Sequence, residues 1–331
     1  MQTARRSIPS GPRTAATTAI ARLWQASPPL TAVSLLMLAA ALASVVGIVV
    51  DPRVITGAPA WLKPFKFAIS TAIYGLTLAW VFTSLPDRPK MRRVVGWTTT
   101  IVFVIEVGII DVQAWRGTTS HFNVGTVLDR TLFAVMGVAI LVQTFASVAV
   151  AVALWRHRFA DRTFGWALRL GMTLTIAGAF TGGLMTRPMP QQLADAYAGK
   201  GMPVVGAHTV GAPDGGPGIP VTGWSRQHGD VRVPHFVGLH ALQVLALFGL
   251  LARRWRRPES VRVRAVQLAA ASYASLFLLL LWQSLRGRSV VAMDADTLTA
   301  LVLWATASFA AFGSLGIFSK NPQHANEGSL A

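Results

Sequence analysis

Polar side chains that can carry chemistry occur at two places inside long apolar runs of the sequence. The first is Glu106, with Thr99 seven residues before it and Gln113 seven residues after it. Seven residues are nearly two helical turns, so the three side chains share one helix face. A charged group at the centre of a bilayer costs roughly 2.5 to 3.5 kcal/mol even on the most permissive scale. Such groups usually have a function, and Glu106 is therefore the candidate catalytic residue, as a metal ligand or a proton acceptor.

The second place is the stretch from Gly229 to Gln243, where an aspartate, an arginine and two histidines open another apolar run. His240 and Gln243 are three residues apart and take neighbouring positions on one helix face. His235 lies at the positive N-terminal end of that helix, which favours a neutral, metal-binding imidazole. His235 and His240 are about 140° apart around an ideal helix, so a shared centre needs an unwound first turn or another ligand.

The third histidine, His121, lies in the loop after the Glu106 run. At about 1.5 Å per residue, Glu106 and Gln243 lie at the same depth of a bilayer. We therefore predict one polar site that opens to the extracytoplasmic side. Its candidate metal ligands are His240, His235 and His121, and its candidate cofactor-binding residues are His240, His235, Gln243 and Gln113. Zinc, iron, copper or axially bound haem b suits these groups, and which cofactor is bound stays open.

Other functions stay open beside a redox centre. Intramembrane Glu and His form proton relays, so Glu106 could exchange protons with a small solute held by Gln113, His240 and Gln243. A non-catalytic sensor or assembly partner is the third possibility. Hydrogen bonds that only join helices, worth about 0.6 to 2 kcal/mol each, explain the same residues without any function. The sequence has no Gly-x-Ser-x-Gly, His-Glu-x-x-His or phosphate-loop motif.

The composition is that of a chain embedded in lipid. Apolar residues make up 53% of the 331 residues, charged residues only 13%, and the mean hydropathy is +0.49. A soluble domain has about 25% charged residues. The net charge of +17 comes from short basic clusters between apolar runs, which argues against a nucleic-acid surface. The absence of cysteine excludes disulfides, cysteine-bound iron–sulfur clusters and covalently attached c-type haem.

Eight apolar runs are long enough for the roughly 20 residues that cross a bilayer. They are residues 30–50, 65–85, 94–114, 131–155, 166–185, 235–252, 265–285 and 297–318. The predicted fold class is an all-α polytopic membrane helix bundle with about eight transmembrane helices. Within the fifth run, Gly178 and Gly182 form a small-residue pair typical of close helix packing.

Basic clusters follow alternate runs, at residues 88–93, 156–162 and 253–264, and tryptophans mark the ends of the runs. The positive-inside rule then places both termini in the cytoplasm and the chain in the inner membrane. Residues 1–28 are predicted to be a disordered basic tail, residues 29–319 the transmembrane domain and residues 320–331 a second cytoplasmic tail. The Gly- and Pro-rich residues 186–234 are a long extracytoplasmic loop, which either caps a site or is a tolerated insertion.

Three motifs also resemble those of an uncharacterised family of bacterial polytopic membrane proteins. They are Trp-x-Lys-Pro-x-Lys-Phe at residues 61–67, Arg-Gly-x-x-Ser-His-Phe-Asn at 116–123 and the His-containing stretch at 229–243. The likeness extends over residues 60–285. It supports the membrane topology and implies no activity.

Overall fold

The computed structural model describes residues 12–315. The tail predicted at residues 320–331 lies outside this range, as do the first eleven residues. The chain forms two compact units. Of the described residues, the first unit contains 12–157 and 183–225, and the second contains 158–182 and 226–315.

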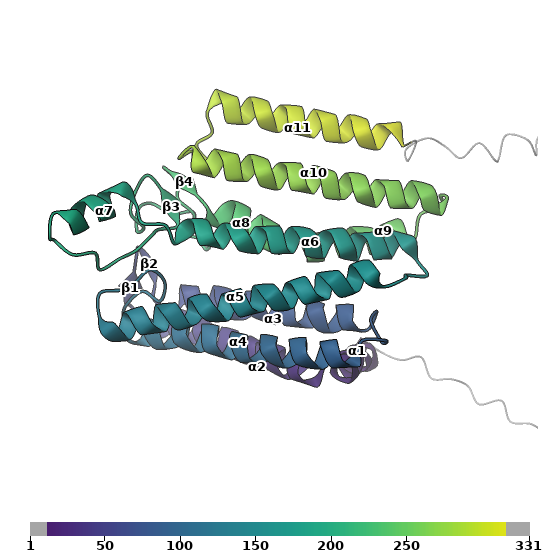
Figure 1. Cartoon of the computed structure of the whole chain (residues 1–331), viewed down its shortest axis with the longest axis horizontal. Coiled ribbons are helices and arrows are strands. Elements are labelled where there is room, and N and C mark those ends of the chain that lie inside the picture. The colour runs from purple at the N-terminus through teal and green to yellow at the C-terminus, as the bar shows by residue number, and fades with distance from the viewer. Residues whose placement is uncertain (1–11, 316–331) are drawn as a thin grey trace, which may run out of the picture. The chain divides into compact units, whose positions relative to one another are not determined.

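The first unit consists mainly of helices that run side by side (Figure 1). They are α1 Pro12–Ala26, α2 Pro28–Val50, α3 Leu62–Phe82, α4 Pro89–Trp115 and α5 Val127–Arg156. Proline in the first turn starts α2 and α4, where a missing N–H costs nothing, and Thr126 caps α5 by accepting a hydrogen bond from Asp129 N. Helix α1 falls in the segment for which the sequence predicts a disordered tail. It contacts α2 and α3, and this packing supplies stability that its composition does not indicate.

Short elements in the loops complete the first unit. Strands β1 Val54–Ile55 and β2 Ala58–Pro59 form a hairpin between α2 and α3. Helix α7 Pro190–Tyr197 and strand β3 Thr209–Val210 belong to the long segment 183–225. The predicted loop therefore has local structure of its own, and α7, with 8 residues, is too short to span a membrane by itself.

The second unit contains helix α6 Arg162–Met185, apart from its last turn, and the C-terminal helices. They are α8 Arg232–Leu239, α9 Ala241–Ala252, α10 Glu259–Leu285 and α11 Ala295–Ser314, preceded by the short strand β4 Gly229–Asp230. Helices α8 and α9 meet at His240 with a bend of 41°. The run predicted at residues 235–252 is thus a broken helix rather than a continuous one.

Within residues 12–315, seven helices are long and apolar enough to cross a membrane, and the number is eight if the bent pair of α8 and α9 forms one span. The predicted all-α, multi-span class is confirmed. Large apolar side chains such as Leu42, Phe145 and Phe309 are exposed on these helices. Exposing so much apolar surface to water would be unfavourable in free energy, whereas the acyl chains of a bilayer solvate it. The chain is a multi-pass membrane protein that contacts the bilayer through these faces.

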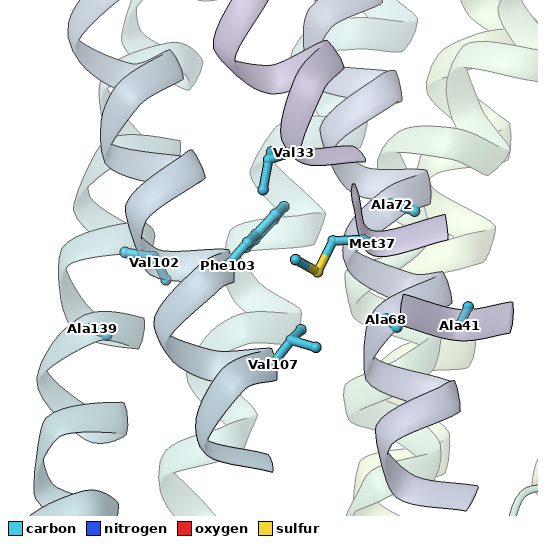
Figure 2. Packing of buried hydrophobic residues seen from close by; sticks show 9 residues of the cluster. All are labelled: Val33, Met37, Ala41, Ala68, Ala72, Val102, Phe103, Val107 and Ala139. Carbon is cyan, nitrogen blue, oxygen red and sulfur yellow. The ribbon is translucent and has the colours of Figure 1, made fainter. Parts of the chain in front are cut away.

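The core of the first unit is built from small and large apolar residues that alternate between helices. Phe103 of α4 points toward Val33 and Met37 of α2, as Figure 2 shows. Alanines 68 and 72 of α3 are fully buried and let α2 approach closely. Tyr74 of α3 lies beside Phe103, with ring centroids 6.0 Å apart, so polar groups border this apolar cluster.

Candidate functional site

Glu106 lies in the buried face of α4, with only 2% of its surface exposed. Thr99 and Gln113 are buried on the same face, as the seven-residue spacing predicts. In the described part of the chain, Glu106 Oε1 and Thr99 Oγ1 have no hydrogen-bond partner. Burying a carboxyl oxygen without a hydrogen-bond donor costs free energy. Such an atom is usually satisfied by a bound water molecule, by protonation of the carboxyl group or by a ligand.

Lys63 is the residue whose positive charge acts on Glu106. It stands in the first turn of α3, and its Nζ lies 5.9 Å from the centre of the Phe67 ring. The buried carboxyl group of Glu106 therefore lies within the electrostatic range of a lysine at the start of the neighbouring helix α3.

Gln113 belongs to a polar network at the end of the first unit where α4 ends and α5 begins. Its Nε2 donates to Asp129 Oδ1 at 2.9 Å, and its Oε1 accepts from Arg116. Arg116 also pairs with Asp129 Oδ1 at 2.6 Å, and Thr126 donates to Asp129 Oδ2 at 2.7 Å. Because both ends of its amide are used, Gln113 acts here as a structural link between α4 and α5.

His121 lies in the loop between α4 and α5, within a cluster of aromatic rings. Its ring centroid is 5.5 Å from that of Phe67, 6.0 Å from that of Phe122 and 6.4 Å from that of Phe133. Phe122 is buried and has a φ of +64°, a left-handed conformation that is strained for a bulky residue. Strain of this kind persists only where the surroundings enforce it, and it is common at functional sites.

The segment 183–225 is bonded to this aromatic loop. Val205 N donates to Phe122 O at 2.8 Å, and Val124 N donates to Pro203 O at 2.9 Å. The ring of His208 packs edge-on against that of Phe122, with centroids 4.8 Å apart. Within the first unit, the Gly- and Pro-rich segment therefore covers the loop that carries His121.

Asp214 fixes the fold of that covering segment. Its carboxylate accepts hydrogen bonds from His208 N, Thr209 N and Thr209 Oγ1, at 3.0, 3.1 and 3.1 Å. Its Oδ2 lies 2.5 Å from His208 Nδ1. Lys66 Nζ of α3 donates to Thr222 O in the same segment at 2.9 Å. These bonds make residues 208–222 an ordered cover in spite of their glycines and prolines.

A second polar group borders the core further along the helices. Tyr74 Oη of α3 lies 2.9 Å from Ser147 Oγ of α5, and Gln143 Nε2 donates to the same oxygen at 3.4 Å. Gln143 Oε1 is buried without a partner in the described part of the chain. Like Glu106 Oε1, this atom is an acceptor that a proton-bearing group or a water molecule would satisfy.

In the second unit, His235 joins α8 to α6. Its Nδ1 lies 2.8 Å from Gly178 O and 3.2 Å from Thr181 Oγ1. Gly178 and Gly238 touch backbone to backbone, so a Cβ at either position would overlap the other residue. The close packing predicted for the glycine pair is present, and Gly178 and Gly238 form its tightest contact.

The acid and the arginine that precede His235 neutralise each other. Arg232 Nη2 lies 2.5 Å from Asp230 Oδ2, and Arg232 Nε donates to Asp230 Oδ1 at 2.9 Å. Ser284 of α10 donates to Asp230 O at 3.0 Å. Asp230 is almost fully buried, so this pair holds the start of α8 against the end of α10.

His240 occupies the break between α8 and α9, with φ −90° and ψ 3°. Thr175 of α6 compensates for the lost helical bonds, because it accepts from Leu242 N at 3.0 Å and donates to Leu239 O at 3.4 Å. His240 is the cap residue of α9, and its backbone O still accepts from Val244 N at 3.1 Å, so Gln243 follows it within the first turn of α9. The break changes the relation of His240 to His235, which lies on α8, and the ring of His240 packs on that of Phe236, with centroids 4.3 Å apart.

The candidate residues thus divide between the units, with Glu106, Gln113 and His121 in the first and His235, His240 and Gln243 in the second. Nowhere in residues 12–315 do three His, Asp or Glu side chains converge as a metal-binding group. Sequence reasoning did not assign Asp129 to the Gln113 network. The Thr126-x-x-Asp129 spacing, typical of a capped helix start, was the signal that could have found it.

The fold is that of a polytopic helical membrane protein. In its first unit, the segment 183–225 covers the polar loop between α4 and α5. Comparison of the chain with protein-family models, with curated proteins and with solved structures found no match.

Proposed function

We propose that the protein is a proton-coupled transporter of small solutes in a bacterial inner membrane, and that Glu106 is the group that exchanges protons. One observation carries the proposal: Glu106 is buried on a spanning helix with an acceptor oxygen that has no donor among the described residues. The other deeply buried acids, Asp129 and Asp230, each have an arginine partner, whereas Asp111, whose Oδ1 also has no partner among the described residues, is only half-buried. An isolated intramembrane carboxyl group is typical of proton relays.

The groups around Glu106 support this role. Lys63 acts on it electrostatically from the first turn of α3, where the chain meets the covering segment. Tyr74, Ser147 and Gln143 supply hydroxyl and amide groups further along the same helices. In this proposal, these groups on the neighbouring helices α3 and α5 supply donors and acceptors for a proton path that ends at Glu106.

The proposal is tested with purified protein in phosphatidylethanolamine and phosphatidylglycerol vesicles that contain the pH-sensitive dye pyranine. A panel of amino acids, carboxylic acids and organic amines is added outside, and a solute-dependent change of internal pH is the readout. We expect Glu106→Gln to abolish the signal and Glu106→Asp to retain part of it. Asp111→Asn, a carboxyl change on the same helix, is the matched control and should keep it. A solute-dependent signal that persists in Glu106→Gln contradicts the proposal.

A metal or haem b centre is the second candidate function, and the orientation of His235 favours it. A carbonyl oxygen only accepts hydrogen bonds, so Nδ1 of His235 donates to Gly178 O and the ring is held in a fixed orientation. Metal-binding histidines are commonly held in this way by a backbone carbonyl. Visible absorption and metal analysis of the purified protein test this candidate. Bound metal or haem that is lost in His235→Ala would support it, whereas a featureless spectrum without metal would rule it out.

A further inference from the structure

One end of the second unit carries a dense group of arginines. It is the end where α6 and α10 begin and α9 ends. Arg253 Nε pairs with Asp161 Oδ2 at 2.6 Å, and Arg162 N donates to Glu259 Oε1 at 3.0 Å. These two contacts bring the segment before α6 and the turn between α9 and α10 together. We call this region the arginine end.

The positive charge at the arginine end far exceeds the negative charge. Its eight arginines are Arg158, Arg162, Arg253, Arg254, Arg256, Arg257, Arg262 and Arg264, and its two acids are Asp161 and Glu259. Both acids already have partners, because Asp161 pairs with Arg253 and Glu259 accepts a hydrogen bond from Arg162 N. Arg254, Arg256 and Arg264 are exposed, and among the described residues none of them forms a salt bridge. The excess charge therefore faces outward and attracts an anion.

Aromatic residues place the arginine end at the level of lipid headgroups. Trp255 packs against Phe248 of α9, with ring centroids 5.8 Å apart. Arg169 of α6 stacks on the rings of Trp166 and Phe159, at 5.7 and 5.4 Å. Tryptophan is enriched where a spanning helix leaves the hydrocarbon region, and long basic side chains bend toward that same level.

An apolar surface that suits acyl chains continues directly from one of these arginines. Leu247 and Leu251 are 58% and 49% exposed on α9, which ends at Ala252. The two leucines are four residues apart and share one face of the helix. Arg254 lies in the turn that follows, and its backbone N donates to Leu251 O at 3.0 Å, so it comes directly after the end of this leucine face. A lipid tail along the leucines would bring its phosphate group to the arginine. Soluble phosphate has no tail to use this surface.

We propose that the arginine end is a binding site for the phosphate group of an anionic phospholipid, with Arg254, Arg256 and Arg264 as its main contacts. The planar guanidinium group forms two parallel hydrogen bonds to a phosphate, which an ammonium group cannot do. Each basic residue near an anionic membrane surface strengthens binding by about fivefold. This inference does not depend on the role of Glu106.

The full chain is exchanged into mixed micelles with equal amounts of phosphatidylglycerol and phosphatidylcholine, and retained lipids are counted by native mass spectrometry. We expect wild type to retain phosphatidylglycerol in preference to phosphatidylcholine. The triple change Arg254→Gln, Arg256→Gln and Arg264→Gln should weaken that retention roughly a hundredfold. The charge-matched control is Arg130→Gln, Arg187→Gln and Lys200→Gln, which are exposed residues of the first unit, and it should retain phosphatidylglycerol.

A second variant keeps the experiment decisive if the triple glutamine protein does not fold. Changing the same three arginines to lysine preserves the charge and removes the paired hydrogen bonds, so retention should fall by about tenfold rather than disappear. Equal retention of both lipids by wild type would overturn the proposal. Equal loss in the control would also overturn it, because binding would then follow net charge alone. Release of the lipid by inorganic phosphate at the same concentration would show a free phosphate site instead.

Discussion

Asp129 at the start of α5 lies 2.6 Å from Arg116 at the end of α4, and the same carboxylate accepts hydrogen bonds from Gln113 and Thr126. A single buried acid therefore ties together the last turn of one spanning helix and the cap of the next. Glu106, two turns deeper on α4, has no such donors in the described part of the chain. The contrast between these two acids separates a structural carboxylate from the candidate functional one.

Replacing Asp129 by Asn should destabilise the protein. The change removes the ion pair with Arg116 and turns one acceptor oxygen into a donor that faces other donors. Since Arg116 is partly exposed, we expect a loss of about 1 to 3 kcal/mol in the free energy of unfolding. The midpoint of thermal unfolding in detergent measures this loss. Arg130→Gln, at the next and exposed position, should have little effect. An unchanged midpoint in Asp129→Asn would show that the network contributes no stability.

Adding a methyl group at Gly178 should separate α6 from α8. The new Cβ would overlap the backbone of Gly238, and backbone atoms cannot move aside as a flexible side chain can. We expect the free energy of unfolding to fall by about 1 to 3 kcal/mol. Gly183→Ala on the same helix is the control, because its Cβ meets nothing within 4 Å and alanine favours the helix by about 0.8 to 1.0 kcal/mol. Equal stability of the two variants would contradict the close contact.

Loss of the Asp214 carboxylate should loosen the covering segment. Asp214→Asn weakens the hydrogen bonds from His208, Thr209 and the His208 ring. We expect amide hydrogen exchange at residues 207–215 to become faster by roughly tenfold or more, while the spanning helices keep their protection. Asp195→Asn, in α7, is the control and should leave residues 207–215 protected. Unchanged exchange in Asp214→Asn would mean that other contacts hold the segment.

Asp51, directly after α2, should make stability depend on acid pH. Hydrogen bonds from Arg53, together with one from Trp61, hold the pKa of Asp51 well below its ordinary value of 3.8. A lowered pKa in the folded state stabilises the protein above pH 3.8, and this contribution is lost as the pH falls through the folded-state pKa.

The midpoint difference between wild type and Asp51→Asn should therefore be constant at neutral pH and shrink as the pH falls below 3.8. Arg53→Gln in the Asp51→Asn background should lower the midpoint further, because Arg53 Nη1 also donates to Trp115 O at 2.8 Å. A difference that stays the same at acid pH would show that Asp51 does not stabilise through its charge.

The positions of the spans follow from the sequence because crossing a bilayer requires a long apolar run. The predicted run at residues 94–114 and the observed α4, Pro89–Trp115, illustrate the agreement. The seven-residue spacing also predicted that Thr99, Glu106 and Gln113 share a buried face, which the structure confirms. Both results depend only on local properties of the chain, namely hydropathy and helical period. The orientation of the chain in the membrane and the roles of the candidate residues stay predictions.

Tertiary contacts decided what each polar side chain does. Only the fold brought Gly178 against Gly238 and Thr175 to the break at His240, and an ideal helix could not reveal either contact. Asp129 became a buried ion pair because α4 and α5 meet at their ends. The sequence by itself determined the spans and their buried faces, since these depend on neighbours along the chain. The partner of a buried polar group depends on residues far away in sequence, and the three-dimensional packing alone determines which of them it meets.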